Sequence, residues 1–154
     1  MKVLFLIGSD NDRSTVEASK SFYDYFGIPV DFIVSSAHRA PEQTARLAAS
    51  ARSDGYSAIV CAAGMAAHLA GLCAACSDLP VIGVPLAGGV QDGLDALLST
   101  AQMPKGVPVA TLSVGKAGAI NSAVLCARIF SLNNEEVRGR LESFRASGCD
   151  LPDS

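Results

Sequence analysis

Histidine and long hydrophobic runs are both scarce in this sequence. The 154 residues include two histidines, and no segment approaches the ~18 consecutive apolar residues that a membrane-spanning helix needs. The apolar run near the N-terminus, in MKVLFLIG, is too short to be the hydrophobic part of a signal peptide with a cleavage site. We therefore expect a cytosolic (cytoplasmic) protein with no membrane partner.

An excess of positive charge is also lacking. The 12 lysines and arginines are outnumbered by 15 aspartates and glutamates, so the formal net charge is -3. Proteins that bind nucleic acid or an anionic membrane through their overall field have the opposite sign. We therefore expect no nucleic-acid partner, and any phosphate that the protein binds must be held by groups close to it.

The cysteines argue against a disulfide framework. Five is an odd number, and they are scattered through apolar segments, as buried free thiols are. Cys73 and Cys76 form a C-x-x-C inside an apolar segment of helical period rather than at a helix start, so we expect no redox or metal chemistry there. The cysteines are Cys61, Cys73, Cys76, Cys126 and Cys149.

Apolar segments of strand length alternate with longer segments of helical period. With 49% hydrophobic residues, a chain of this length can form one sizeable core, so we expect a single domain over residues 1–154. The alternation predicts an α/β fold, a parallel sheet with helices on both faces, followed by a charged C-terminal helix. Strands are expected at 2–8, 30–35, 57–64, 80–86 and 107–114, and helices at 12–27, 41–55, 65–77, 92–103, 117–132 and 134–147.

The loops that follow these strands are where a ligand site is expected, because ligands of open parallel sheets bind beyond the carboxyl ends of the strands. In the first loop, GSDND, the backbone N–H groups and the side chains of Ser9 and Asn11 suit a phosphate. The same residues are also typical of a simple cap and turn. A carboxylate would repel phosphate, so we assign Asp12 to sugar hydroxyls or to the helix cap.

The second loop, SSAHRAPE, contains the cation that the first loop lacks. Arg39 offers a planar, permanently charged fork for a phosphate or carboxylate, and Ser36 can donate a hydrogen bond to the same group. His38 has a ring that can transfer protons near neutral pH. On the residues alone, His38 is either a structural loop residue or a proton carrier.

The third loop combines small residues with the second histidine. Ala63 and Gly64 allow a flat or anionic ligand to approach the backbone closely. His68 is expected about one turn into the following helix, where it is either a core residue or a second polar contact to the ligand.

These loops and the segments around them resemble the N5-carboxyaminoimidazole ribonucleotide mutase family of purine biosynthesis, class I of the PurE proteins. The likeness spans about residues 3–145, and SAHR and QMPKGVPVAT are its most specific blocks. The matching blocks, in order, are GSDND, SSAHRAPE, AAGMAAHLAG, LPVIGVPL and GLDALLSTAQMPKGVPVATLSVGKAGAINSAVLCARIF.

The resemblance implies a flavodoxin-like three-layer α/β/α fold assembled as a homo-octamer, with neither a metal nor an organic cofactor. It implies a nucleotide substrate whose carboxyl group moves from the exocyclic nitrogen to a ring carbon through enclosed carbon dioxide. The implied catalytic residues are His38, as general acid and base, and His68. The implied substrate contacts are Ser9, Asn11, Asp12, Ser36, Arg39, Ala63, Gly64, Met65, Ala66 and Leu69.

The sequence departs from the family at three positions. Met65 follows Gly64 where the family usually has a second glycine, so its side chain occupies space that glycine leaves open. Ala70 stands where a proline is usual, and Asn11 where a serine is usual. We expect the first of these to reshape the carboxylate pocket.

Three alternatives remain open at this point. A related branch carboxylates the unmodified aminoimidazole ribonucleotide with free carbon dioxide, but it generally lacks the histidine that matches His68. A more distant relative that carboxylates a nicotinate dinucleotide shares the AGM string but lacks the SAHR and QMP blocks. A non-catalytic phosphate or nucleotide-binding module on this fold would use the same glycine turn and Arg39, yet would need neither histidine.

Overall fold

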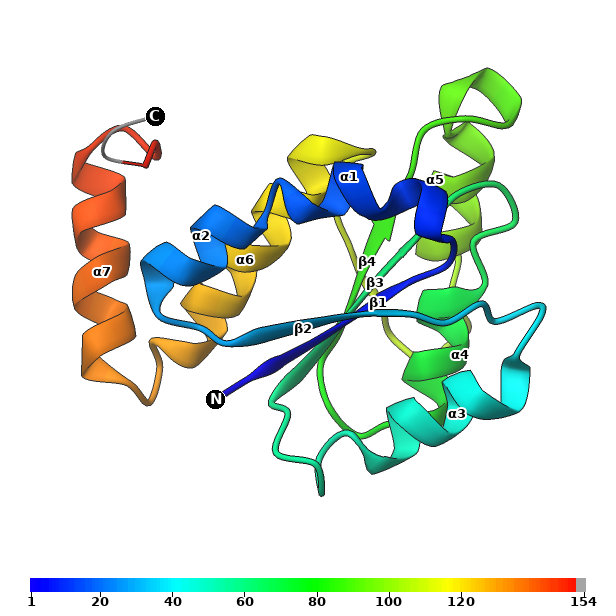
Figure 1. The fold of residues 1–154 in the computed structure, drawn as a ribbon, viewed down its shortest axis with the longest axis horizontal. Helices are drawn as coiled ribbons and strands as arrows, with labels where there is room; N and C mark the ends of the chain where they lie inside the picture. The colour runs from blue at the N-terminus through cyan, green and yellow to red at the C-terminus, as the bar shows by residue number, and fades with distance from the viewer. Residues whose placement is uncertain (152–154) are drawn as a thin grey trace.

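Five parallel strands form the centre of the molecule (Figure 1). The computed structural model describes residues 1–151, and within them the strand order is β2-β1-β3-β4-β5, the order of flavodoxin-like sheets. The expected α/β class and parallel sheet are therefore confirmed. The strands are β1 (Val3–Ile7), β2 (Val30–Val34), β3 (Ala58–Ala63), β4 (Val81–Pro85) and β5 (Ala110–Thr111).

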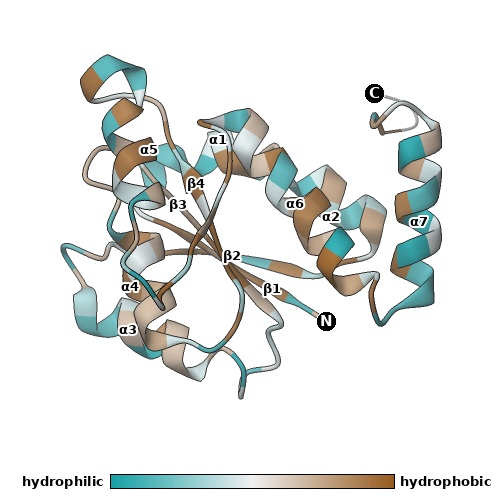
Figure 2. Ribbon diagram, turned by 180° about the vertical axis from the view of Figure 1, so that it is seen from behind, coloured by the Kyte–Doolittle hydropathy of each residue, from teal (hydrophilic) through white to brown (hydrophobic). Residues whose placement is uncertain are grey.

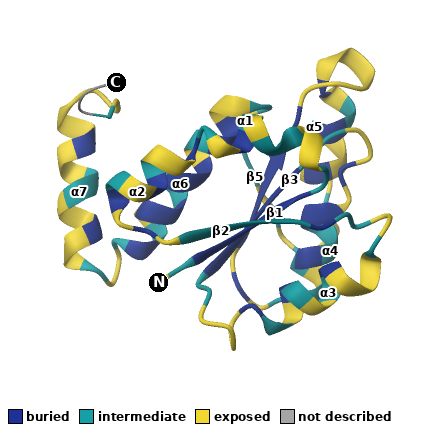
Figure 3. Ribbon diagram, in the orientation of Figure 1, coloured by how far each residue is buried: buried dark blue, intermediate teal, exposed yellow. Residues whose placement is uncertain are grey.

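Alternate residues of β1 point into two separate cores. Val3, Phe5 and Ile7 belong to one buried cluster. Leu4 and Leu6 belong to the other, as the two-residue period of a strand requires. Helices cover both clusters, which makes three layers, and the inner strands are buried on both faces (Figure 3). One face has α1 (Arg13–Glu17), α2 (Lys20–Phe26) and α6 (Lys116–Phe130), and the other has α3 (Pro41–Ser50), α4 (Leu69–Cys76) and α5 (Leu94–Ala101).

The C-terminal helix α7 (Glu135–Ala146) lies outside these layers. It packs on α2 and α6, where the Phe144 ring lies edge-on to Phe26 with centroids 5.3 Å apart. The Asn134 side chain caps the helix by accepting a hydrogen bond from the Val137 N–H at 2.9 Å. The ribbon of α7 is mainly hydrophilic, in contrast to the hydrophobic strands (Figure 2). The helix therefore packs on α2 and α6 through its few apolar residues.

The expected helix over 12–27 is broken into two. A 3-10 turn, η1 (Asp10–Asp12), precedes α1, and α2 starts only at Lys20. The buried Ser19 hydroxyl donates to the Val16 carbonyl at 2.6 Å, which offers the backbone an alternative to a continuous helix. The expected stop at Gly27 is confirmed, because this residue ends α2 in the left-handed conformation at φ 68°.

The strand register aligns the carboxyl ends that bear the candidate loops. Ile7 of β1 is opposite Val34 of β2 and Ala62 of β3, and Ala63 is opposite Pro85 of β4. Loops that are far apart in sequence therefore begin at one edge of the sheet. Across residues 1–151, none of the helices combines the length and apolarity needed to cross a membrane.

Candidate active site

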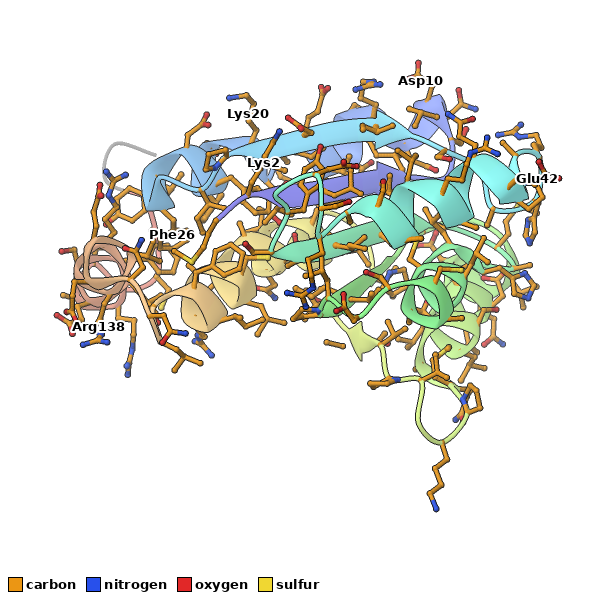
Figure 4. The ribbon with its side chains drawn as sticks, turned by 90° about the horizontal axis from the view of Figure 1, so that it is seen from below. Lys2, Asp10, Lys20, Phe26, Glu42 and Arg138 are labelled. Atoms are coloured by element: carbon orange, nitrogen blue, oxygen red, sulfur yellow. The ribbon has the colours of Figure 1, made fainter. Side chains whose placement is uncertain are left out.

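Three of the candidate loops form one pocket at the carboxyl edge of the sheet. It has a volume of about 310 Å³ and lies between the loops after β1, β3 and β4. In Figure 4, Asp10 and Glu42 mark the regions of the first and second loops at the same end of the molecule, opposite Arg138 of α7. The pocket residues are Gly8, Ser9, Asn11, Asp12, Ala63, Gly64, Met65, Ala87, Gly88 and Gly89.

The first loop presents a hydroxyl group with a free proton. Ser9 caps η1, and its Oγ accepts a 3.4 Å hydrogen bond from the Asn11 N–H. The Ser9 O–H can therefore donate to a ligand, and the Asn11 side chain lines the same pocket. The charge of Asp10 is partly offset by Arg13, whose Nε donates to Asp10 Oδ1 at 2.8 Å. The loop thus offers donors to an anion and has one of its two carboxylates paired.

Asp12 lines the pocket without capping a helix. It occupies the N-cap position of α1, but its side chain makes no capping hydrogen bond. Of the two roles that the sequence left open, the cap is therefore not used. Partial burial raises the pKa of the Asp12 carboxyl, because a desolvated carboxylate is less stable in its charged form. A partly desolvated acceptor of this kind suits the hydroxyl groups of a sugar.

The second loop reaches the first through Arg39. The Arg39 guanidinium donates from Nη2 to the Gly8 carbonyl at 3.4 Å. The Arg39 backbone N–H donates to Ser36 Oγ at 3.3 Å, so Ser36 holds the turn from which the guanidinium extends. Neither Ser36 nor Arg39 lines the pocket itself. The cation is therefore beside the first loop, at the rim next to Gly8.

The two histidines are in direct contact. His38 Nε2 and His68 Nδ1 are 2.6 Å apart, and the rings are nearly perpendicular at 80°. A contact this short between ring nitrogens requires one nitrogen to donate a proton and the other to accept it. Both side chains are exposed, so neither is a core histidine. The fold thus brings two residues that are 30 positions apart in the sequence into one hydrogen-bonded pair that shares a proton.

His68 lies at the start of α4 rather than one turn inside it, which corrects the expected helix over 65–77. Met65 has φ 54°, a left-handed conformation that a helix cannot continue through. The helix therefore begins at Leu69, and His68 is its N-cap residue without a capping bond from its side chain. The ring of His68 is consequently free to meet His38.

Besides Ser36 and Arg39, two more of the expected substrate contacts do not line the pocket. Leu69 is 1% exposed and packs in the core cluster beneath the loop. Ala66 is exposed but is not among the pocket residues. Ala70 is 3% exposed in the first turn of α4, where the backbone N–H has no helical partner and either alanine or proline fits.

The fourth loop contributes pocket residues that the sequence did not identify individually. Ala87, Gly88 and Gly89 form one wall, and both glycines have positive φ, at 102° and 74°. Asp92 and Asp95 shape this wall, because their carboxylates accept hydrogen bonds from the N–H groups of Gly88 and Val90 at 3.2 and 3.1 Å. The signal in the sequence was the glycine pair after a predicted strand.

A family model matches nearly the whole chain, and similar proteins from two bacteria carry the same activity name. A family model described as AIR carboxylase matches residues 2–149. A Pseudomonas aeruginosa protein named N5-carboxyaminoimidazole ribonucleotide mutase is 45% identical over 142 residues, 92% of this chain and 87% of that protein. One of the same name from Aliivibrio fischeri is 43% identical over 151 residues, 98% of this chain and 94% of that protein.

The fold is shared with a solved structure. The crystal structure of Treponema denticola PurE superposes on this chain with a TM-score of 0.86 at 27% sequence identity. The alignment covers 96% of this chain and 91% of that one. The flavodoxin-like three-layer architecture is therefore common to both.

Proposed function

This chain belongs to the AIR carboxylase family, and we propose that it is a mutase of purine biosynthesis that converts N5-carboxyaminoimidazole ribonucleotide to 4-carboxy-5-aminoimidazole ribonucleotide. The names of relatives at 43–45% identity support this activity. The observation that carries the proposal is the 2.6 Å contact between His38 and His68, which lie on the loops after β2 and β3, outside the residues that line the pocket. A phosphate-binding module has no need of this pair.

Residues in the pocket and on the neighbouring second loop bind different parts of the substrate. The Ser9 hydroxyl, Asn11 and the Arg39 guanidinium bind the phosphate, with Ser36 holding Arg39 in place. Asp12 accepts hydrogen bonds from the ribose hydroxyls. This arrangement leaves the base to extend toward the loop at 63–66, where Gly64 and its neighbours allow close approach of a flat ring.

The isomerisation requires one proton to be given and one to be taken back. When the bond between the exocyclic nitrogen and the carboxyl carbon breaks, carbon dioxide is released and the nitrogen gains a proton from His38. The ring carbon then attacks carbon dioxide and loses its own proton to the same histidine. His68, as the hydrogen-bond partner of His38, holds the ring in place and accepts or returns the shared proton. The two steps together are an isomerisation, with neither a redox step nor a covalent intermediate on the enzyme.

The mutase and the carboxylase that uses free carbon dioxide differ in which substrate they consume. Purified protein is incubated with N5-carboxyaminoimidazole ribonucleotide, and separately with aminoimidazole ribonucleotide plus bicarbonate, at matched low carbon dioxide. We expect rapid formation of the ring-carboxylated product, followed by absorbance, from the first substrate only. Rapid conversion of the second substrate would assign the protein to the carboxylase, and no conversion of either would refute both.

The proposal includes assembly as a homo-octamer in the cytosol. The number of subunits comes from the family, and exposed apolar side chains support self-association. Val90, Leu94 and Leu98 are 63%, 39% and 49% exposed and follow one another at intervals of four residues. Val90 is next to the pocket glycines 88 and 89, so a second copy seated on these side chains would also cover the edge of the pocket.

A further inference from the structure

Met65 has two features that are unfavourable for a methionine. Its φ of 54° lies in the left-handed region, where a Cβ atom crowds the backbone and which glycine occupies freely. The residue is also 66% exposed, so burial of apolar surface does not compensate for that conformation. Strained backbone persists where the surroundings or the function require it. The side chain at this position therefore needs an explanation beyond folding.

The turn itself has a structural purpose that glycine would serve equally well. It buries Ala67, which is 3% exposed, and brings His68 to the start of α4 and into contact with His38. A glycine at position 65 would make the same turn without the crowding. Formation of the histidine pair thus accounts for the backbone conformation of Met65 but not for its thioether side chain.

The Met65 side chain lies at the pocket, where it can contact a bound ligand. Among the described pocket residues, Met65 alone has a large apolar side chain, and the others are small, or polar in the first loop. Carbon dioxide is small and neutral, so a site can retain it only by enclosure and exclusion of water. An unbranched thioether chain adapts its shape to what it covers.

We propose that the Met65 side chain closes the pocket over the reacting ring and retains released carbon dioxide until the ring carbon captures it. This inference rests on the proposed mutase function. In the retained path, the carboxyl group leaves the nitrogen as carbon dioxide and returns to the ring carbon of the same molecule. When carbon dioxide escapes instead, the products are free aminoimidazole ribonucleotide and carbon dioxide. The nitrogen has then gained a proton while the ring carbon keeps its own, so one proton is consumed overall.

The test measures how each variant divides the substrate between these two outcomes. N5-carboxyaminoimidazole ribonucleotide is mixed with the wild-type protein, Met65→Gly or Met65→Leu in buffer depleted of carbon dioxide. Ring-carboxylated product and free aminoimidazole ribonucleotide are quantified after rapid quenching, and spontaneous decay without protein is subtracted. We expect Met65→Gly to raise the ratio of free amine to carboxylated product about tenfold or more, and Met65→Leu to resemble the wild type because it restores the apolar cover.

A stability measurement separates loss of the cover from damage to the fold. Met65→Gly relieves the left-handed strain, so its thermal unfolding temperature should equal or exceed that of the wild type while its product ratio worsens. An unchanged ratio in Met65→Gly, or a ratio in Met65→Leu as poor as that of the glycine variant, would overturn the inference and leave the mutase activity standing. If the wild type converts none of the substrate, the proposed function fails first, and this inference fails with it.

Discussion

The proposed chemistry depends on a few side chains whose conformations follow from their immediate neighbours. The Ser9 hydroxyl accepts a hydrogen bond from the Asn11 N–H, and the Arg39 guanidinium donates one to the Gly8 carbonyl, so the groups proposed to bind phosphate are oriented before it arrives. The two histidines hold each other in the same way at 2.6 Å. Such preorganisation lowers the cost of ordering the site when substrate binds.

Replacing His38 by asparagine should separate catalysis from binding. An amide can still hydrogen-bond to His68 but cannot carry a proton, so we expect kcat to fall by about 10²- to 10⁴-fold. Affinity for aminoimidazole ribonucleotide, measured by calorimetry, should change little because the phosphate contacts remain. Full turnover in His38→Asn would refute the role of this residue, and loss of binding with intact Arg39 would indicate a damaged site instead.

Asp12→Asn should increase stability and decrease function. Burial raises the pKa of Asp12 above its ordinary value of 3.8, so the folded state binds the proton more tightly than the unfolded state. The contribution of this group to stability therefore falls as the pH rises through 3.8 toward the folded pKa, and the ionised group costs stability at neutral pH. We expect Asp12→Asn to raise the thermal unfolding temperature at pH 7, with the gain vanishing in acid.

The same Asp12 variant should raise KM, because an amide presents a weaker acceptor to the ribose hydroxyls. Glu142→Gln, on the exposed surface of α7, removes the same charge and serves as the control. A lower unfolding temperature in Asp12→Asn than in this control, at pH 7, would show that the carboxylate stabilises the apo protein and that burial is not its main influence.

At the level of elements, left-handed residues decide where helices end and begin. Gly27 ends α2 at φ 68°, and Met65 delays the start of α4 at φ 54°. The first was predictable, because a glycine after an apolar helical pattern is a common stop signal. The second was not, because methionine is a good helix former and nothing local marks it as left-handed.

Two glycine-to-alanine substitutions should therefore have opposite effects. At Gly27 the new Cβ would adopt a crowded left-handed conformation 2.9 Å from Arg140 Nη1, and we expect a loss of about 1 kcal/mol or more. At Gly139, within α7, no heavy atom lies within 4 Å of the added Cβ, and we expect a gain of about 0.5 to 1 kcal/mol. Urea unfolding monitored by circular dichroism measures both. Equal signs would show that the backbone conformation is not the cause.

For the whole molecule, the pocket and the exposed apolar side chains are continuous. Gly88 and Gly89 line the pocket, Val90 follows them in a 3-10 turn, and Leu94 and Leu98 lie on α5. In the proposed assembly, another copy of the chain covers this apolar surface beside the pocket. The site would then be completed by assembly.

Leu98→Asp should disrupt this assembly. Leu98 is 49% exposed, so the substitution leaves the core of one subunit intact while placing a charge in the proposed contact. We expect a smaller particle in native mass spectrometry and a lower turnover, with an unchanged circular dichroism spectrum. Ala49→Asp, on the exposed surface of α3, introduces the same charge and should leave the mass unchanged. A wild-type mass in Leu98→Asp would place the contact elsewhere.

The sequence by itself determined the α/β class, the parallel sheet, and the loops after β1 to β4 as the place of the site. Strand periodicity is local, and the rule that ligands bind at carboxyl ends then follows from topology. The resemblance to the family added the expected catalytic roles of the two histidines, which the residues alone had left open. Only the tertiary structure decided that His38 and His68 are in contact, that the Asp12 side chain does not cap α1, and that Ala87 to Gly89 line the pocket. These are contacts between segments far apart in sequence, or choices among local hydrogen bonds, and local patterns do not specify either.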